Sequence, residues 1–196
     1  MKIVKILKKI KRRLTKLGMK RLSANELAES YQGILYHMGK NVELFSTNFS
    51  TEPYLISIHD NVTVASGVKF ITHDYSIRNL SIYAGHEIGY YDKVGSIELF
   101  DNCFIGAYSI LMPNTSVGKN SVIAAGSVVT KHVPDNEVWG GAPAHFIMTI
   151  DQYLAKVSEN SAKYSWMPLE KKMSLNEEQL IILRQNYFFA ERNKSF

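Results

Sequence analysis

The chain has a single cysteine, Cys103, and no long run of apolar residues. One cysteine excludes a disulfide within the chain, and no apolar stretch approaches the roughly 18 residues that a membrane-spanning helix needs. No apolar signal-peptide core precedes a cleavage site. With 45% hydrophobic and 21% charged residues among 196, the composition is ordinary for one soluble domain. These observations favour a reduced, cytoplasmic protein.

Acidic residues are missing from the N-terminal segment. Residues 1–21 hold ten Lys and Arg and no acid, whereas the other 175 residues hold 13 Lys and Arg against 18 acids. The net positive charge therefore lies in residues 1–21, the basic arm, and does not indicate a nucleic-acid-binding face on the rest of the protein. Apolar residues recur in the arm at helical spacing, up to a stop signal at Gly18. We expect a basic amphipathic helix that is solvated, packs on the protein, or makes peripheral contact with an anionic inner membrane face.

An aliphatic residue recurs every six positions between residues 99 and 134, and a small or slender residue follows each by four positions. The aliphatic positions are Leu99, Ile105, Leu111, Val117, Ile123 and Val129. The small positions are Cys103, Ser109, Thr115, Ser121, Ser127 and Val133. A period of six is typical of hexapeptide β-helix repeats, in which three hexapeptides make one triangular coil. We predict two complete coils, 99–116 and 117–134, with Cys103 as a compact core residue rather than a nucleophile.

Weaker repeats precede this segment. One coil has Ile58, Val64 and Phe70 in the aliphatic positions and Val62 and Val68 in the small ones. A fainter start lies at Met38 and Leu44, and the count breaks by two residues within 46–53. The 29 positions from Phe70 to Leu99 exceed one coil of 18 by 11. This excess predicts an excursion loop within about 75–94.

After Pro143 the composition becomes helical. The sequence Ser174-Leu175-Asn176-Glu177 is typical of a capping box that begins a helix reaching about Ala190, and a shorter helix is expected over about 150–162. These helices would cover an open end of the β-helix or form a subunit contact. The predicted organisation is a basic helical segment at 1–36, a β-helix at 37–148 and a helical segment at 149–196.

Several motifs resemble those of a known family. They are Ile105-Gly106, Val117-Gly118-Lys119-Asn120-Ser121, AAGSVVTK at 124–131 and GGAPA at 140–144. They are similar to the hexapeptide-repeat acyltransferase superfamily, most of all to its maltose, galactoside and polysaccharide O-acetyltransferase branch. The resemblance implies a left-handed parallel β-helix, which is an exception to the right-handed crossover rule. It also implies a homotrimer that uses acetyl-CoA as cosubstrate and needs no metal.

His73 is the candidate catalytic base. Transfer of an acetyl group to a hydroxyl needs a base that is partly free near neutral pH, which suits histidine. His73 follows Thr72 at the end of a coil and begins the excursion loop. The resembled family has its catalytic histidine in such a Thr-His pair, within a cleft between two subunits. His86 is the rival, and either Asp74 or Glu98 would hold the His73 ring in one tautomer.

Two further groups of residues are candidates for binding. The acceptor candidates lie in the irregular turn before His73 or in the excursion loop, and are Asn48, Glu52, Asp74, Tyr75, Tyr83 and His86. The loop tyrosines could equally pack on a neighbouring coil. By resemblance, the CoA candidates are Phe104, Ala107, Ala125, Thr130, Lys131 and His145. Of these, Lys131 suits the CoA phosphates as a point charge, and His145 stands where the family has a phosphate-binding arginine.

The sequence therefore predicts an acetyl-CoA-dependent O-acetyltransferase that transfers acetyl directly to a hydroxyl of a sugar or surface-polysaccharide precursor. Alternatives within the class are an antibiotic acetyltransferase of streptogramin or chloramphenicol type and an amino-sugar N-acetyltransferase. A catalytically silent β-helix scaffold is the non-enzyme alternative. A metal hydratase resembling γ-carbonic anhydrase is disfavoured because no three histidines have the spacing to bridge two subunits. The basic arm favours a glycan precursor, because such precursors are assembled at a membrane face.

Overall fold

The structure is a computed structural model that describes residues 22–190. The chain divides between residues 150 and 151 into two compact units. The basic arm at 1–21, with the helix predicted for it, lies outside the described residues. Within the described range, no helix is both long enough and apolar enough to cross a bilayer.

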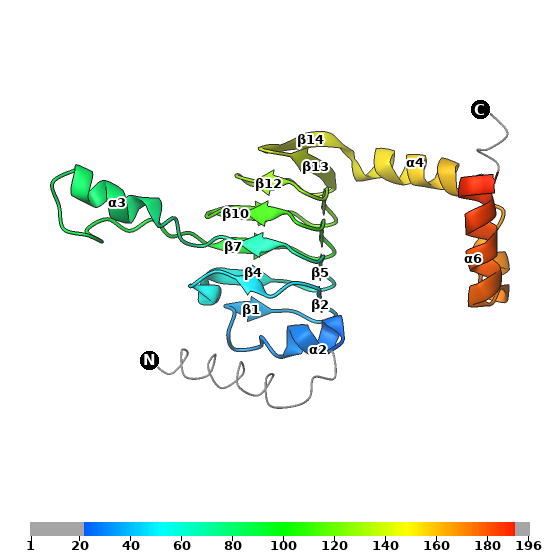
Figure 1. Ribbon diagram of the computed structural model, residues 1–196, viewed down its shortest axis with the longest axis horizontal. Helices are drawn as coiled ribbons and strands as arrows, with labels where there is room; N and C mark the ends of the chain where they lie inside the picture. The colour runs from blue at the N-terminus through cyan, green and yellow to red at the C-terminus, as the bar shows by residue number, and fades with distance from the viewer. Residues whose placement is uncertain (1–21, 191–196) are drawn as a thin grey trace. The chain divides into compact units, whose positions relative to one another are not determined.

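Short parallel strands stack into three sheets that form the sides of a triangular β-helix (Figure 1). Sheet A contains, in spatial order, β1 (His37–Met38), β4 (Ile56–Ile58), β7 (Ile97–Leu99) and β10 (Thr115–Val117). Sheet B contains β2 (Glu43–Leu44), β5 (Thr63–Val64), β8 (Phe104–Ile105), β11 (Val122–Ile123), β13 (Glu137–Gly141) and β14 (Ala144–Thr149). Sheet C contains β3 (Asn48–Phe49), β6 (Lys69–Phe70), β9 (Ile110–Leu111) and β12 (Val128–Val129). The fold is the left-handed parallel β-helix that the sequence predicts.

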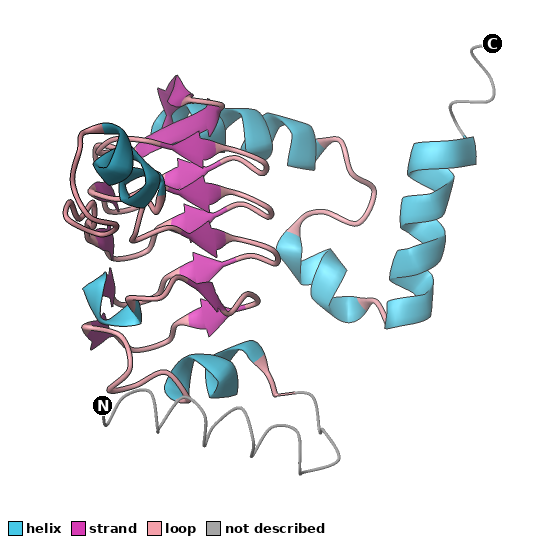
Figure 2. Ribbon diagram, turned by 60° about the vertical axis from the view of Figure 1, so that its left-hand side comes forward, coloured by secondary structure: helices cyan, strands magenta, loops and turns pink. Residues whose placement is uncertain are grey.

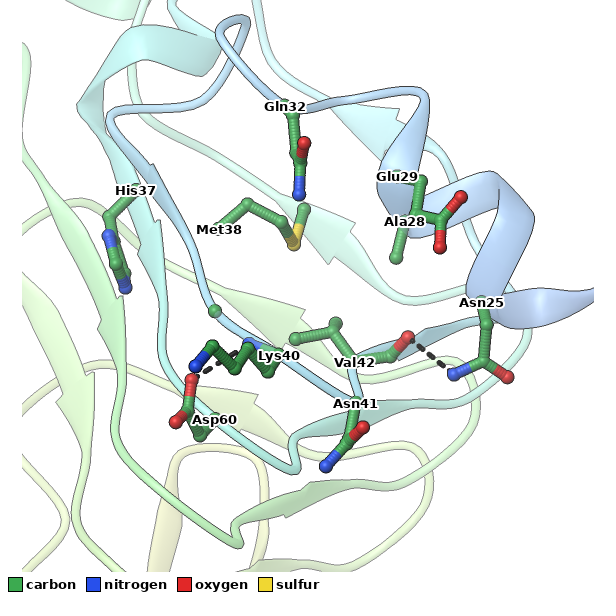
Figure 3. Close-up of a pocket in the computed structure, with 11 residues that line it drawn as sticks. Asn25, Ala28, Glu29, Gln32, His37, Met38, Lys40, Asn41, Val42 and Asp60 are labelled. Carbon is green, nitrogen blue, oxygen red and sulfur yellow. Dashed lines mark hydrogen bonds between the residues drawn. The ribbon is translucent and has the colours of Figure 1, made fainter.

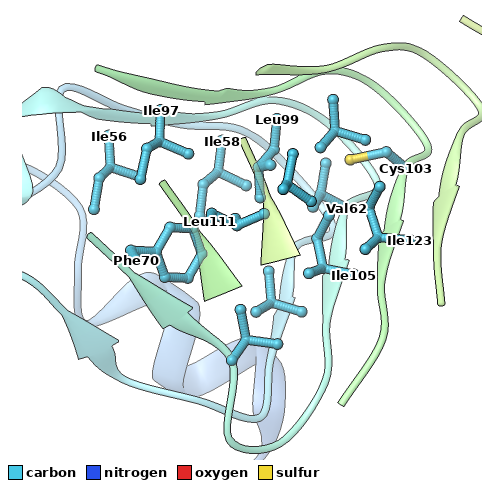
Figure 4. Close-up of a cluster of buried hydrophobic side chains, with 14 of the residues drawn as sticks. Ile56, Ile58, Val62, Phe70, Ile97, Leu99, Cys103, Ile105, Leu111 and Ile123 are labelled. Carbon is cyan, nitrogen blue, oxygen red and sulfur yellow. The ribbon is translucent and has the colours of Figure 1, made fainter. Parts of the chain in front are cut away.

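The aliphatic positions of the repeat form the core of the β-helix (Figure 4). All six of those between 99 and 134 are at most 1% exposed, and so are Ile58, Val64 and Phe70 of the weaker coil. Burial of each such side chain contributes about 1.5–3 kcal/mol. The small positions are buried as well, and their serine hydroxyls bond to backbone carbonyls, as Ser127 does to Ala124 at 2.6 Å. The two predicted coils, 99–116 and 117–134, are confirmed.

An asparagine ladder runs along the corner between sheets A and B. Its members are Asn41, Asn61, Asn102, Asn120 and Asn136. All five have left-handed backbone angles, with φ between 54° and 62°. Asparagine tolerates this conformation better than most residues. Each side-chain amide donates to the next side-chain oxygen at 2.8–3.1 Å. The ladder therefore ties every coil to its neighbour.

The excursion loop is longer than predicted. Paired residues Ile58 of β4 and Leu99 of β7 are 41 positions apart, which is 23 more than a regular coil of 18. The predicted excess of 11 is wrong because β7 follows β6 as the next side of the triangle rather than a full coil later. The excursion carries α3 (Ser76–Tyr83) away from the stack of strands (Figure 1). Its neck is a narrow ribbon in which the backbone of Asp74 bonds to Lys93 and that of Gly95 to Thr72.

Both ends of the strand stack are covered within the first unit. At one end α2 (Ala24–Glu29) lies across the strand stack (Figure 2). It begins in a capping box of Ser23 with Glu26, and its buried Ala28 belongs to the core. At the other end β14 returns along β13 to form an antiparallel hairpin, and Trp139 of β13 is only 7% exposed. The irregular turn at 46–53 precedes a short 3-10 helix, η1 (Pro53–Leu55).

The C-terminal helices are α4 (Ile150–Ala162), α5 (Leu169–Ser174) and α6 (Glu177–Gln185), followed by a π-helical turn, η2 (Asn186–Ala190). The predicted helices at 150–162 and up to Ala190 are present, but the predicted cap is wrong. Asn176, not Ser174, caps α6 in a box with Gln179. Ser174 belongs to α5, where its hydroxyl donates to the carbonyl of Lys171. Their predicted role as a cover or subunit contact stays a prediction.

Candidate active site

His73 lies directly beyond β6, where the chain leaves the β-helix for the excursion. A β-bridge to Val94 on the returning strand fixes its backbone. The Nδ1 atom of the ring lies 2.9 Å from the Glu52 carboxylate, and Nε2 lies 3.2 Å from Asp92. The Tyr75 ring stacks on the imidazole, with centroids 4.2 Å apart. The structure therefore brings together three residues of the predicted site, His73, Glu52 and Tyr75, and adds Asp92.

Glu52 is fixed by the irregular turn just before η1. Its side chain is only 14% exposed and accepts hydrogen bonds from the hydroxyls of Thr51 and Thr72 as well as contacting His73. Burial acts to raise the pKa of Glu52, but these hydrogen bonds outweigh it and leave the pKa below its usual value. The carboxylate is therefore ionised at neutral pH. An ionised carboxylate only accepts hydrogen bonds, so a neutral His73 paired with it carries its proton on Nδ1.

Asp92 approaches the opposite edge of the imidazole from the excursion. Its side chain is 71% exposed, in contrast to the 17% of His73. Both ring nitrogens can bond a carboxylate at the same time only when the ring carries two protons. On a neutral ring protonated at Nδ1, the Nε2 lone pair would face the Asp92 carboxylate, and the two would not bond.

The two residues predicted to orient His73 bond elsewhere. Asp74 pairs with Lys93 at 2.7 Å, and the Lys93 hydrogen bond is the main reason that the pKa of Asp74 lies well below its usual range. Glu98 lies on β7 and pairs with His59 at 2.8 Å. The prediction that Asp74 or Glu98 orients the ring is therefore wrong. Glu52, expected only to bind the acceptor, contacts Nδ1 instead.

The remaining acceptor candidates make no contact with His73 in the structure. Tyr83 ends α3 with 91% of its surface exposed. His86 stacks on Tyr90 within the excursion, with ring centroids 4.0 Å apart. Asn48 is exposed on sheet C, in register with Lys69. Sequence reasoning missed Asp92, because the pairing of the excursion neck that carries it to the ring is not visible in the repeat.

The CoA candidates lie on successive turns of the β-helix. Ala107 and Ala125 follow β8 and β11 at equivalent corners, and the amide of Gly126 donates to the carbonyl of Ala107 at 2.8 Å. Thr130 follows β12, and the ammonium group of Lys131 lies 5.1 Å from the centre of the Trp139 ring. Phe104 is 41% exposed on sheet B, and His145 is exposed on β14. Ala107 and Ala125 thus lie at the corner after sheet B, whereas Lys131 lies beyond sheet C.

The described residues also bear on metal binding and on the reactivity of the cysteine. Within residues 22–190, no group of three or more His, Cys, Asp or Glu side chains is placed to hold a metal ion. Cys103 is buried, and burial raises its pKa to about 12. A thiol with that pKa is almost entirely protonated at neutral pH and is a poor nucleophile.

Comparisons with known proteins agree with this architecture. Residues 96–131 match the family model described as bacterial transferase hexapeptide (six repeats). The chain is 36% identical over 175 residues to Protein CapG of Staphylococcus aureus, covering 88% of this chain and 96% of CapG. It is 32% identical over 120 residues to the galactoside O-acetyltransferase of Escherichia coli, covering 59% of this chain and 54% of that enzyme. It thus spans nearly all of CapG and about half of the galactoside enzyme.

Solved structures share the fold. A maltose O-acetyltransferase from Clostridium difficile superposes with a TM-score of 0.55 at 24% identity, covering 75% of this chain and 87% of that chain. A galactoside acetyltransferase in complex with coenzyme A superposes with a TM-score of 0.54 at 20% identity, covering 77% and 84%. The repeat, the β-helix and the extent of the match to CapG define a hexapeptide transferase. The chain belongs to the hexapeptide-repeat acyltransferase family, as its motifs predicted, and is an acyltransferase.

Proposed function

We propose that this acyltransferase transfers the acetyl group of acetyl-CoA to a hydroxyl of a sugar or surface-polysaccharide precursor, with His73 as the general base. The observation that carries the proposal is the contact between His73 Nδ1 and the Glu52 carboxylate at 2.9 Å. A largely buried carboxylate that holds Nδ1 leaves Nε2 as the nitrogen that takes a proton, once an acceptor hydroxyl replaces Asp92 beside it. The names of the galactoside and maltose O-acetyltransferases among the relatives support a sugar hydroxyl as the acceptor.

The chemistry assigned to the chain is proton transfer at Nε2 of His73. As the acceptor oxygen attacks the thioester carbonyl carbon, its proton passes to Nε2. Glu52 stabilises the imidazolium that forms, because its negative charge lies 2.9 Å from the other ring nitrogen. The carbon–sulfur bond then breaks, and the proton moves from Nε2 to the departing sulfur. The products are the acetyl ester and free CoA thiol, and His73 is neutral again.

The residues available for acetyl-CoA fit an extended ligand that lies along the coils. Ala107 and Ala125 have methyl side chains at equivalent corners of neighbouring coils, so a pantetheine chain could approach their backbone. Lys131 is exposed and could meet the phosphates. The exposed rings of Phe104 and His145 lie on sheet B. Acetyl-CoA would supply the activated acyl group, and the chain itself would supply the base.

We further propose a homotrimer in which each cleft between subunits holds one site. His73 is 17% exposed at the surface of a single β-helix, which gives an acceptor one wall to bind against. Closed rotational symmetry would give three equivalent clefts. Light scattering should report about 67 kDa, three times the 22.2 kDa of one chain. A fully active monomer would contradict the shared cleft.

Release of free CoA thiol from acetyl-CoA, measured with a panel of glycosides and nucleotide sugars, tests the function. One acceptor class should accelerate the release, and His73→Ala should lower turnover by about 10²–10⁴-fold, as expected for a lost general base. The matched control is His132→Ala, since His132 bonds to the Ser116 hydroxyl on sheet A and should be dispensable. Unchanged turnover in His73→Ala would contradict the mechanism. Absence of acceptor-dependent release with every sugar would contradict the substrate class.

A further inference from the structure

A groove of about 520 Å³ opens between α2 and the first coil of the β-helix (Figure 3). Its volume falls within the range of about 300–1,000 Å³ that is usual for small-molecule sites. The groove lies at the corner between sheets A and B, next to β1. His73 lies at a different corner, after sheet C and one coil further on. The groove is therefore a separate place in the fold from the proposed acetylation site.

The walls of the groove are held in position by the fold. The Asn25 amide of α2 donates to the carbonyl of Val42 at 3.2 Å and ties the helix to the first coil. On the other side, the backbone amide of Lys40 donates to the Asp60 carboxylate at 2.8 Å. A Cβ atom at Gly39 would come within 2.5 Å of Asp60, so this turn packs too closely for a larger residue. A ligand would therefore meet a site that needs little reorganisation.

Polar groups without partners line this fixed frame. In the described part of the chain, no hydrogen bond or ion pair engages the Glu29 carboxylate, the Gln32 amide or the Lys40 ammonium group. All three side chains are exposed on the rim. Ala28, Met38 and Val42 form an apolar floor, as Figure 3 shows. Donors and acceptors thus surround a small apolar surface.

The charge of the lining narrows the ligand class. Glu29 and Asp60 contribute two negative charges and Lys40 contributes one positive charge. A nucleotide or phosphate would meet an excess of negative charge. A pyranose ring offers hydroxyls that both donate and accept, together with a C–H face for the floor of Met38 and Val42. We propose that this groove binds a saccharide unit, independently of the acetylation at His73.

The Met38 methyl group provides a local probe of binding. Methionine-methyl NMR of the full-length protein would resolve Met38 among seven methionines, with Met38→Leu to assign it. Maltose, methyl β-galactoside and N-acetylglucosamine are titrated to roughly 10 mM, which nearly fills a site with a Kd of about 1 mM. We expect a saturable shift of the Met38 methyl with at least one sugar. Inorganic phosphate and spermidine should leave it unmoved.

Variants locate the binding and separate it from catalysis. Glu29→Ala with Gln32→Ala should weaken the sugar-dependent shift at least about tenfold, because hydrogen bonds to a charged group are lost. Lys40→Ala should weaken it as well, and Glu178→Ala, an exposed acid on α6, serves as the control. Acetyl transfer, measured as release of CoA thiol, should persist in the double variant, in Lys40→Ala and in Glu178→Ala. No shift with any sugar, a shift that survives the double variant, or a response to phosphate alone would overturn the proposal without affecting the proposed acetyl transfer.

Discussion

The side chain of Asn61 donates a hydrogen bond to that of Asn102 at 3.1 Å, although 41 positions of sequence separate the two residues. The bond joins the coil before the excursion to the coil after it. Both residues have left-handed backbone angles, with φ of 57° and 62°. The neck of the excursion joins these two coils and carries His73, so their relative position also bears on the surroundings of the proposed base. The asparagine ladder is therefore part of what positions the site.

Asn102→Ala should lower the free energy of unfolding by about 1–3 kcal/mol, because it removes two ladder hydrogen bonds and leaves an alanine in a left-handed conformation. Asn102→Gly loses the same bonds without that backbone strain and should cost less. Urea unfolding at equal protein concentration would measure both. Equal losses in the two variants would show that the backbone angle contributes nothing, and no loss in either would remove the ladder as a stabilising feature.

Glu52→Gln should lower kcat by about 10²-fold or more and change the KM for the acceptor little, because the variant loses the charge that stabilises the His73 imidazolium but keeps a similar shape. Glu98→Gln is the matched control, since Glu98 bonds His59 at 2.8 Å in the same manner. Steady-state kinetics with one acceptor would compare them. If the two variants lose activity equally, Glu52 has no special relation to the base.

The repeat itself could be predicted because a core position in a β-helix recurs at a fixed spacing and tolerates few residue types. Ile105 and Ile123 are recognisable in the sequence for that reason, and both are fully buried. The length of the excursion could not be counted in the same way. When the six-residue repeat starts again after an interruption, its spacing does not show which of the three sheets the next strand joins. In the structure β7 forms the side of the triangle that directly follows β6.

The surroundings of His73 depend on contacts that sequence spacing does not encode. Glu52 reaches the ring because the irregular turn before η1 places it beside β6, and Asp92 does so because His73 pairs with Val94. The acid nearest to His73 in the sequence, Asp74, forms an ion pair with Lys93 instead. A charged neighbour in sequence is thus a poor guide to the partner of a base that lies at the neck of a loop.

Cys103 should resist alkylation in the native protein at pH 8 and react rapidly in urea. Burial raises its pKa to about 12, whereas an exposed thiol has a pKa of about 8.5. The stability due to this difference is complete below about pH 8.5 and falls as pH rises toward 12, because only the unfolded chain ionises in that window. Iodoacetamide labelling followed by mass spectrometry would measure it, with Cys103→Ala as an unlabelled control. Rapid native labelling that abolishes transfer would contradict a purely structural thiol.

Deletion of residues 1–21 should abolish binding to anionic vesicles and leave acetyl transfer to a soluble acceptor intact. The arm carries ten basic residues and no acid, and each basic residue near an anionic surface contributes about 1 kcal/mol. Three arms on one trimer would add avidity. Co-sedimentation should show binding to anionic but not neutral vesicles, weakened by salt.

Ile10→Asn keeps every charge but interrupts the apolar stripe, so weaker binding of this variant would indicate an inserted amphipathic helix rather than charge alone. Equal binding with and without the arm would refute the membrane contact and leave the assignment of His73 unaffected.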